Sequence, residues 1–330
     1  MTSLIQPNLN ADVYRNMTAA DRPPVLDKNL QFISIYNETS AVLGGSNMGH
    51  HYWGGTVWYY NDITDFDRNK AYVATRTESG VCDVVCIESD KFAVGEDNGA
   101  LQVFHLVTKS DDLQELQCAG YAALHDDSLL SLSIFHDKKH IVSCGLDYCI
   151  KIWDISELMA IQSFGFAHTD MIHCVDIKPG SDSEFVSVSS DCEALLWDTR
   201  LSKPARSILK RDSGLTAVNW NPHLLNVVAI GTEDGKVVIV DARMGGTEPL
   251  QESYHFTRTI HKLLYHPHAE GILAACCDDV TVQVFDTNDH LSSIYLDERH
   301  KDMVRGLTWF KDNLYSCSWD STVLKHAVKF

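Results

Sequence analysis

The chain combines a large size with a strongly acidic composition. It has 330 residues and a formal net charge of −18, from 45 acidic and 27 basic residues. A surface of this charge repels nucleic acid and anionic membranes and favours basic proteins as partners. The sequence shows neither a basic segment followed by an apolar stretch at its start nor an apolar run long enough to span a membrane, so we expect cytoplasmic and nuclear localisation.

The first 29 residues predict an arm rather than a domain. Segment 1–29 is rich in Asn, Asp and Pro and shows little hydrophobic periodicity. Alternating apolar residues begin near Leu30. They predict strands over 31–36, 41–43 and 56–60. We therefore expect a short arm followed by one folded domain over 30–330.

The connection after the second predicted strand carries the main candidate interaction residue. Segment 45–54 reads as a loop longer than the other turns, framed by glycines that let the backbone project. Trp53 is its predicted principal anchor, with Tyr52 and His51 as secondary contacts, because large aromatic side chains are frequent binding hot spots. The alternative is that Trp53 packs on its own strands. Adjacent histidines at 50 and 51 without further spaced ligands do not define a metal site.

A turn residue recurs along the rest of the chain at nearly constant intervals. The positions are Asn98, Asp147, Asp191, Asp234, Asp279 and Asp320, separated by 49, 44, 43, 45 and 41 residues. Six residues after each lies the predicted end of a strand, at Phe104, Trp153, Trp197, Val240, Phe285 and His326. Periods of 40 to 45 residues are typical of propeller blades with four strands each. With the stretch that begins near Leu30, the spacing predicts seven repeats.

The third and fourth repeats share a set of four polar landmarks. The landmarks are His125, Ser143, Asp147 and Trp153 in one repeat, and His168, Ser187, Asp191 and Trp197 in the next. We expect each set to form a buried hydrogen-bond network, because the carboxylate, imidazole, hydroxyl and indole N–H can satisfy one another. A Ser-His-Asp hydrolase triad is the alternative interpretation. An enzyme rarely needs its site twice, so the repetition favours a structural role.

These features resemble the WD-repeat propellers, whose repeats carry the histidine, the turn aspartate and the Trp-Asp ending. The resemblance implies an all-β, seven-bladed WD40 β-propeller. Repeat seven keeps His300, Ser316 and Asp320 but has His326 in the Trp position. Repeats two, five and six keep little more than the turn and are expected to rely on packing alone. Because the sequence stops after three strands of the last repeat, we predict that the arm 1–29 supplies its outer strand.

Four further stretches resemble one family, the WD-repeat subunits of the methylosome. They are Trp53-Gly54-Gly55-Thr56-Val57-Trp58, Asp97-Asn98-Gly99-Ala100-Leu101, Leu195-Leu196-Trp197-Asp198-Thr199-Arg200 with Lys203-Pro204-Ala205, and His300-Lys301-Asp302-Met303-Val304-Arg305. The resemblance implies a non-catalytic adaptor in a hetero-oligomer. Its implied partner is the arginine methyltransferase that makes symmetric dimethylarginine, to which it presents histone and Sm-protein tails.

The main alternative is a substrate receptor of a cullin-RING ubiquitin ligase. Trp197, Asp198 and Arg200 fit the Trp-Asp-x-Arg box of such receptors, and segment 240–243 echoes it, although Arg200 can also pair with a neighbouring carboxylate. The sequence contains no glycine-rich phosphate loop, no Cys-x-x-Cys pair and no nucleophile elbow. We therefore expect no catalytic residues, no cofactor and no metal.

Overall fold

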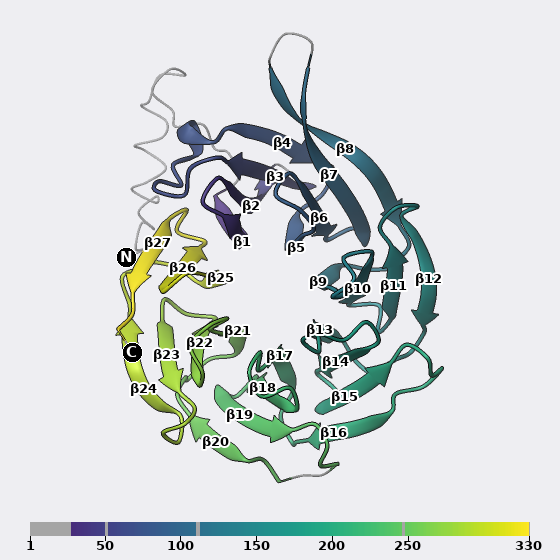
Figure 1. The fold of residues 1–330 in the computed structure, drawn as a ribbon, viewed down its shortest axis with the longest axis vertical. Coiled ribbons are helices and arrows are strands. Elements are labelled where there is room, and N and C mark those ends of the chain that lie inside the picture. Colours follow the sequence, from purple (N-terminus) through teal and green to yellow (C-terminus); the bar gives the residue numbers. More distant parts are fainter. Residues whose placement is uncertain (1–27, 50–51, 110–112, 246–247, 330) are drawn as a thin grey trace, which may run out of the picture.

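The computed structural model describes residues 28–49, 52–109, 113–245 and 248–329, excluding the side chains of 48, 49, 52 and 53. The chain forms seven antiparallel sheets arranged around a central axis, as a seven-bladed propeller (Figure 1). Within each sheet the strands follow one another in sequence order from the centre to the rim. The all-β, seven-bladed prediction is confirmed.

The blades follow the chain without crossover. Blade 1 contains β1 (Asn29–Asn37), β2 (Ser40–Gly49), β3 (Tyr52–Tyr60) and β4 (Val73–Thr77), with the short 3-10 helix η1 (Arg68–Lys70) before β4. Blade 2 contains β5 (Val81–Cys86), β6 (Lys91–Glu96), β7 (Ala100–Thr108) and β8 (Gln114–Ala123). Blade 3 contains β9 (Leu129–Ile134), β10 (His140–Gly145), β11 (Ile150–Asp154) and β12 (Met159–Phe164). Blade 4 contains β13 (Ile172–Ile177), β14 (Glu184–Ser189), β15 (Glu193–Asp198) and β16 (Arg206–Lys210).

The remaining blades continue this order. Blade 5 contains β17 (Leu215–Trp220), β18 (Val227–Thr232), β19 (Lys236–Asp241) and β20 (Gln251–Tyr254). Blade 6 contains β21 (Ile260–Tyr265), β22 (Ile272–Cys277), β23 (Val282–Asp286) and β24 (Ser292–Asp297). Blade 7 contains β25 (Val304–Phe310), β26 (Asn313–Ser318) and β27 (Val323–Ala327), three strands within the described part of the chain. The predicted arm strand of this blade lies in residues outside that part.

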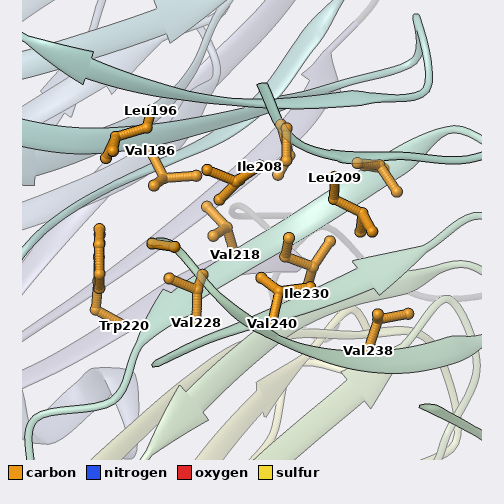
Figure 2. Close-up of a cluster of buried hydrophobic side chains, with 14 residues drawn as sticks. Val186, Leu196, Ile208, Leu209, Val218, Trp220, Val228, Ile230, Val238 and Val240 are labelled. Carbon is orange, nitrogen blue, oxygen red and sulfur yellow. The ribbon is translucent and has the colours of Figure 1, made fainter. Parts of the chain in front are cut away.

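Each blade buries its faces against its neighbours. Between blades 4 and 5, Val186 and Leu196 of one blade meet Trp220, Val228 and Val240 of the other, and all five side chains are buried (Figure 2). A single four-stranded sheet cannot cover both of its own faces, so stacking around the axis supplies the missing apolar contacts. The ring closes where β1 packs against β25.

The periodic positions fall where the spacing placed them. The turn residues lie between the second and third strands of blades 2 to 7. The strand positions six residues on occupy one register site, opposite Phe92, Ile141, Phe185, Val228, Leu273 and Leu314 respectively. The repeat period therefore located the third strand of each of these blades, but these positions are not the strand ends: five strands continue for one more residue and β7 continues to Thr108.

The predicted loop over 45–54 is wrong. β2 continues to Gly49 and β3 begins at Tyr52, so the two strands form nine consecutive pairs, against five in the equivalent hairpin of blade 3. The two glycines that flank the segment are closely packed, because a Cβ on Gly44 would overlap the Phe32 ring and one on Gly55 the Thr77 side chain, whereas Gly54 within it has open space around it. The segment is an extended β2–β3 hairpin.

A charge pair crosses the centre of the ring. Lys262 Nζ in blade 6 lies 3.3 Å from Asp83 Oδ1 in blade 2, and Asp83 Oδ2 accepts a hydrogen bond of 3.0 Å from the N–H of Leu132 in blade 3. Burial alone would lower the pKa of Lys262, but the Asp83 carboxylate outweighs it and raises the pKa above its usual value. The pair therefore links blades that are not neighbours.

Polar contacts also join blades that lack the full landmark set. Asp176 Oδ2 in blade 4 accepts from the N–H of Trp220 at 2.8 Å and from Asn219 Nδ2 at 3.0 Å, both in blade 5. Asn219 Oδ1 in turn accepts from the N–H of Tyr265 in blade 6 at 2.8 Å. Burial raises the pKa of Asp176 to about 6 despite these donors. Blades 5 and 6 thus do not rely on packing alone, which corrects the expectation.

Candidate functional site

The eight predicted landmarks of blades 3 and 4 meet in two matching networks. In blade 3, His125 Nδ1 lies 2.8 Å from Asp147 Oδ2, and His125 Nε2 lies 2.7 Å from Ser143 Oγ. Trp153 Nε1 donates to the same Ser143 oxygen at 2.8 Å. The corresponding distances among His168, Asp191, Ser187 and Trp197 in blade 4 are 2.8, 2.7 and 2.8 Å. The structure thus brings the eight predicted residues together in two hydrogen-bonded sets of four.

The donors and acceptors available in these networks determine which ring nitrogen of each histidine carries the proton. The Asp147 carboxylate can only accept, so His125 Nδ1–H donates to it, and His125 Nε2 accepts from the Ser143 hydroxyl. The Ser143 oxygen then accepts from the indole of Trp153, and Ser143 and Trp153 are fully buried. The serine hydroxyl is thus enclosed between two rings. It has no open side from which to attack a substrate, so the arrangement does not fit a hydrolase triad.

The turn aspartates also bind the backbone. Asp191 Oδ2 accepts from the N–H of Thr169 at 3.0 Å, and its Oδ1 accepts from the N–H of Glu193 at 3.1 Å. Burial would raise the pKa of Asp191, but the His168 side chain and these backbone donors outweigh it and lower the pKa to about 2. Asp191 thus remains ionised and joins the loop before blade 4 to a turn within it.

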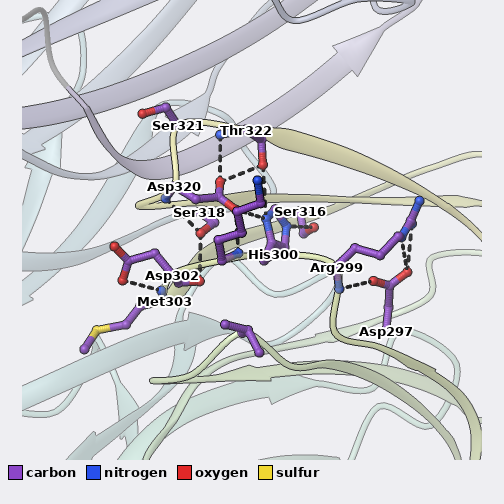
Figure 3. A network of polar contacts seen from close by, with 12 residues as sticks. Asp297, Arg299, His300, Asp302, Met303, Ser316, Ser318, Asp320, Ser321 and Thr322 are labelled. Atoms are coloured by element: carbon purple, nitrogen blue, oxygen red, sulfur yellow. Dashed lines mark hydrogen bonds and ion pairs between the residues drawn. The ribbon is translucent and has the colours of Figure 1, made fainter. Parts of the chain in front are cut away.

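Blade 7 builds a similar network around His300, Ser316 and Asp320 (Figure 3), and adds a second histidine to it. His300 Nδ1 lies 3.0 Å from Asp320 Oδ2, and His300 Nε2 lies 2.7 Å from Ser316 Oγ. His326 Nε2, in the Trp position, lies 2.7 Å from the same serine oxygen. His326 therefore replaces the indole as the donor to Ser316.

The second nitrogen of His326 faces a group that the sequence analysis missed. His326 Nδ1 lies 3.3 Å from Asp297 Oδ2 and 3.1 Å from the hydroxyl of Tyr295, while Arg299 Nε donates to Asp297 at 2.7 Å. Burial lowers the pKa of His326 to about 4, although Asp297 opposes this shift. The signal in the sequence is the Asp-x-Arg spacing of 297–299, which also occurs at 198–200 and 241–243.

The proposed ubiquitin-ligase box has a local partner for its arginine. Arg200 Nε donates to Asp198 Oδ1 at 2.8 Å, and Arg243 Nε donates to Asp241 Oδ1 at 3.0 Å. Asp198 and Asp241 lie at the ends of β15 and β19. Trp197 is buried inside blade 4, so of the three box residues only Arg200 is strongly exposed.

The predicted anchor residues lie at the end of the extended β2–β3 hairpin. The backbone of Trp53 pairs with Met48 and that of Tyr52 with Gly49, whereas His51 and the side chains of Tyr52 and Trp53 fall outside the described part. The described residues contain no cluster of His, Cys, Asp and Glu able to hold a metal ion, and no helix long and apolar enough to cross a membrane. The binding role of Trp53 stays a prediction.

The ring of sheets and the repeated His-Ser-Asp-Trp network define the WD-repeat β-propeller class. In agreement, the family model described as WD domain, G-beta repeat matches residues 121–154, which include the network of blade 3 up to Asp154. The methylosome protein WDR77 of Xenopus laevis is 31% identical over 310 residues, which cover 92% of this chain and 91% of that protein. The chain therefore belongs to the WDR77 family of methylosome WD-repeat proteins.

Other relatives share parts of the propeller. The E3 ubiquitin-protein ligase COP1 of Arabidopsis thaliana is 23% identical over 62% of this chain and 30% of its own length. A guanine nucleotide-binding protein subunit beta of Nicotiana plumbaginifolia is 30% identical over 40% of this chain and 33% of its own length. These partial matches reflect the shared repeat and do not favour the ubiquitin-ligase alternative.

Proposed function

We propose that this chain is a non-catalytic scaffold subunit of a methylosome, which binds a symmetric protein arginine methyltransferase and presents basic substrates to it. The observation that carries the proposal is the similarity to methylosome protein WDR77, because it extends over nearly the full length of both proteins. Function in the cytoplasm and the nucleus is part of the same proposal.

The polar networks support a scaffold rather than an enzyme. Their serines are fully buried, and each hydroxyl is held between a histidine and a second ring donor. Such networks stabilise the blades by satisfying buried groups. They offer a substrate no exposed nucleophile.

One face of the propeller supports the basic-substrate part of the proposal. Because strands alternate in direction, the turns between second and third strands and the links between blades share one face of the disc. These segments hold many of the carboxylates. The exposed ones include Glu78, Asp126, Asp127, Asp212, Glu233, Asp234 and Asp279. A face of this charge attracts arginine-rich segments such as histone and Sm-protein tails.

The β2–β3 hairpin is the proposed attachment point for the methyltransferase. It lies on the same acidic face, because it is the second connection of blade 1. Its nine strand pairs give it a defined backbone beyond the length of its counterpart in blade 3, and its final pairs carry Trp53 and Tyr52. An indole at such a tip is suited to bury about 200 Å² in a partner pocket.

Co-purification with the methyltransferase tests this proposal. Trp53→Ala should weaken binding by about 30-fold to 1,000-fold, the usual cost of truncating a buried interface tryptophan, and leave the melting temperature of the free chain unchanged. Tyr72→Ala is the matched control, because Tyr72 is an exposed aromatic residue of blade 1 in the connection between β3 and β4, on the opposite face. A lower melting temperature with an intact complex would show that Trp53 packs on its own blade.

A further inference from the structure

The opposite face of the disc carries a patch of reversed charge at blades 4 and 5. Three connections meet there: 199–205 between β15 and β16, 221–226 between β17 and β18, and 242–250 between β19 and β20, of which 246–247 lie outside the described residues. Together with Arg206, the first residue of β16, they contain four basic residues and one acidic residue, the exposed Glu248, in a chain with 45 acidic and 27 basic residues. We refer to their exposed side chains Arg200, Leu201, Arg206, Leu225, Arg243 and Met244 as the basic-apolar patch.

The three connections lie against one another. Arg206 Nη1 in blade 4 donates to the carbonyl oxygen of Arg243 in blade 5 at 2.6 Å. Within blade 5, the N–H of Ala242 donates to the carbonyl oxygen of Asn226 at 2.7 Å. Beneath them, the buried cluster of blades 4 and 5 provides a rigid base that includes Leu196 and Trp220 (Figure 2). The patch is therefore continuous across the junction between the two blades.

The patch exposes both apolar and cationic groups. Leu201 is 47% exposed, Leu225 48% and Met244 64%, and the side chains of Arg200 and Arg243 are 75% and 70% exposed. Arginine and methionine are enriched at protein interfaces relative to other surfaces. Neighbouring exposed aliphatic side chains on a rigid surface are typical of a site that another protein covers.

The two arginines are not needed for the turns in which they lie. The strand-ending aspartates of blades 4 and 5 accept from the N–H of Arg200 at 3.0 Å and of Arg243 at 2.9 Å. In blade 3 the equivalent aspartate, Asp154, accepts from the N–H of Ser156 at 2.7 Å, and in blade 6 Asp286 accepts from that of Asn288 at 2.8 Å. Serine and asparagine therefore complete the same turn, so the guanidinium groups are additional to it.

Each aspartate holds its arginine in one orientation. Nε and Nη2 bind the carboxylate, and no Nη1 partner of Arg200 or Arg243 occurs among the described residues. An exposed ion pair of this kind contributes little to folding stability. It does restrict the arginine side chain before binding, which lowers the entropy cost of a later contact to a carboxylate.

We propose that the basic-apolar patch binds a protein segment that carries carboxylates next to aliphatic or aromatic side chains. The carboxylates bind the free edges of the two arginines, and the apolar side chains cover Leu201, Leu225 and Met244. This partner occupies the face opposite to the β2–β3 hairpin. It is therefore distinct from the methyltransferase of the proposed function.

A display library of random short peptides, selected against the immobilised full chain, tests this proposal. We expect enrichment of peptides that combine Glu or Asp with Leu, Met or Phe. The double variant Arg200→Ser/Arg243→Asn should bind the selected peptides at least about tenfold more weakly, a typical cost of losing charge-assisted contacts. Met244→Ser should weaken them as well. Both arginine replacements occur at the equivalent positions of blades 3 and 6, so the double variant should fold as the wild type does.

Lys210→Ser is the matched control. Lys210 is an exposed cation at the opposite end of β16 from Arg206, so its loss should leave peptide binding unchanged. The proposal is overturned if no such peptides are enriched, if the double variant binds them normally, or if Lys210→Ser weakens them equally. Co-purification of the methyltransferase with the double variant should remain normal. Its loss would assign the patch to the enzyme and remove the second partner.

Discussion

Blades 4 and 7 use different side chains to donate a hydrogen bond to the equivalent serine, which is Ser187 in blade 4 and Ser316 in blade 7. In blade 4 the donor is the indole of Trp197, which packs on Phe164 and Phe185 with ring centroids 4.9 and 6.0 Å apart. In blade 7 it is the imidazole of His326, whose second nitrogen faces Asp297. An indole contributes apolar packing and never titrates, whereas an imidazole contributes less apolar area and can gain a proton. The hydrogen bond is common to both blades, but its dependence on pH is not.

The substitution Trp197→His, which gives blade 4 the histidine of blade 7, should produce the largest loss of stability. Trp197→His keeps a donor for Ser187 but removes much of a fully buried ring, so we expect a loss of about 3 to 5 kcal/mol, as in other large-to-small core substitutions. Trp197→Phe keeps most of the ring and removes the donor, and should cost about 1 to 3 kcal/mol. Urea denaturation measures both. Equal losses would show that packing does not set the difference between the blades.

The pH dependence of stability should distinguish blade 7. The unfolded chain protonates His326 near its ordinary pKa of 6.5, but burial lowers the folded value to about 4. Protons therefore favour the unfolded state as pH falls from 6.5 to 4, and up to about 3 kcal/mol is lost across this window and restored above it.

His326→Gln is the reference for that measurement, because its amide can still donate to Ser316 but does not titrate. Other groups titrate in both proteins, including Glu96, whose pKa burial raises to about 7 with the opposite effect on stability. The expected result is thus a steeper loss of stability towards pH 4 in the wild type than in the variant. Parallel curves would exclude His326 as the source.

Removal of the arm should affect blade 7 before any other blade. If segment 1–27 supplies the outer strand of the sheet β25-β26-β27, its deletion exposes a strand edge. The melting temperature should then fall by several degrees, which corresponds to a loss of about 2 to 3 kcal/mol in the free energy of unfolding. This deletion leaves β1 complete, since β1 begins at Asn29. Calorimetry of the full and shortened chains provides the comparison. An unchanged melting temperature would contradict closure by the arm.

Loss of one turn carboxylate should have the smallest effect. Asp191→Ala removes the acceptor of His168 and of two backbone N–H groups, which should cost about 1 to 3 kcal/mol, and Asp147→Ala should behave alike. Asp126→Ala, an exposed neighbour of His125, should change stability by less than about 0.5 kcal/mol. Equal values for the three variants would argue against a structural role for the networks.

The sequence allowed the parts of the fold that depend on local periodicity to be predicted. Asp147, Asp191 and their equivalents each lie in a turn that is followed by a buried strand. Their regular spacing therefore located the blades and the residues of both polar networks. The extension of the β2–β3 hairpin was not predictable in this way. Gly44 and Gly55 lie against Phe32 and Thr77, and periodicity does not reveal these contacts.

Contacts between distant segments were also missed. Lys262 and Asp83 are 179 positions apart, and neither shows a local pattern that would suggest a pair. The basic-apolar patch could not be predicted either, because its residues come from separate connections that only the folded ring brings together. Arg200 was noted from its motif, but the motif does not indicate which exposed leucine or methionine lies beside it.

The closure of the ring at β1 and β25 constrains the order in which the protein assembles on the ribosome. β1 emerges before the other strands of the ring, but its neighbour β25 begins at Val304, after all the strands of blades 2 to 6. Blades 2 to 6 can stack as they appear, because each contacts the blade made just before it. The exposed flank of blade 1, including Leu30 and Ile33, must wait for the last blade. During this interval the nascent chain presents an open apolar surface that chaperones are suited to cover.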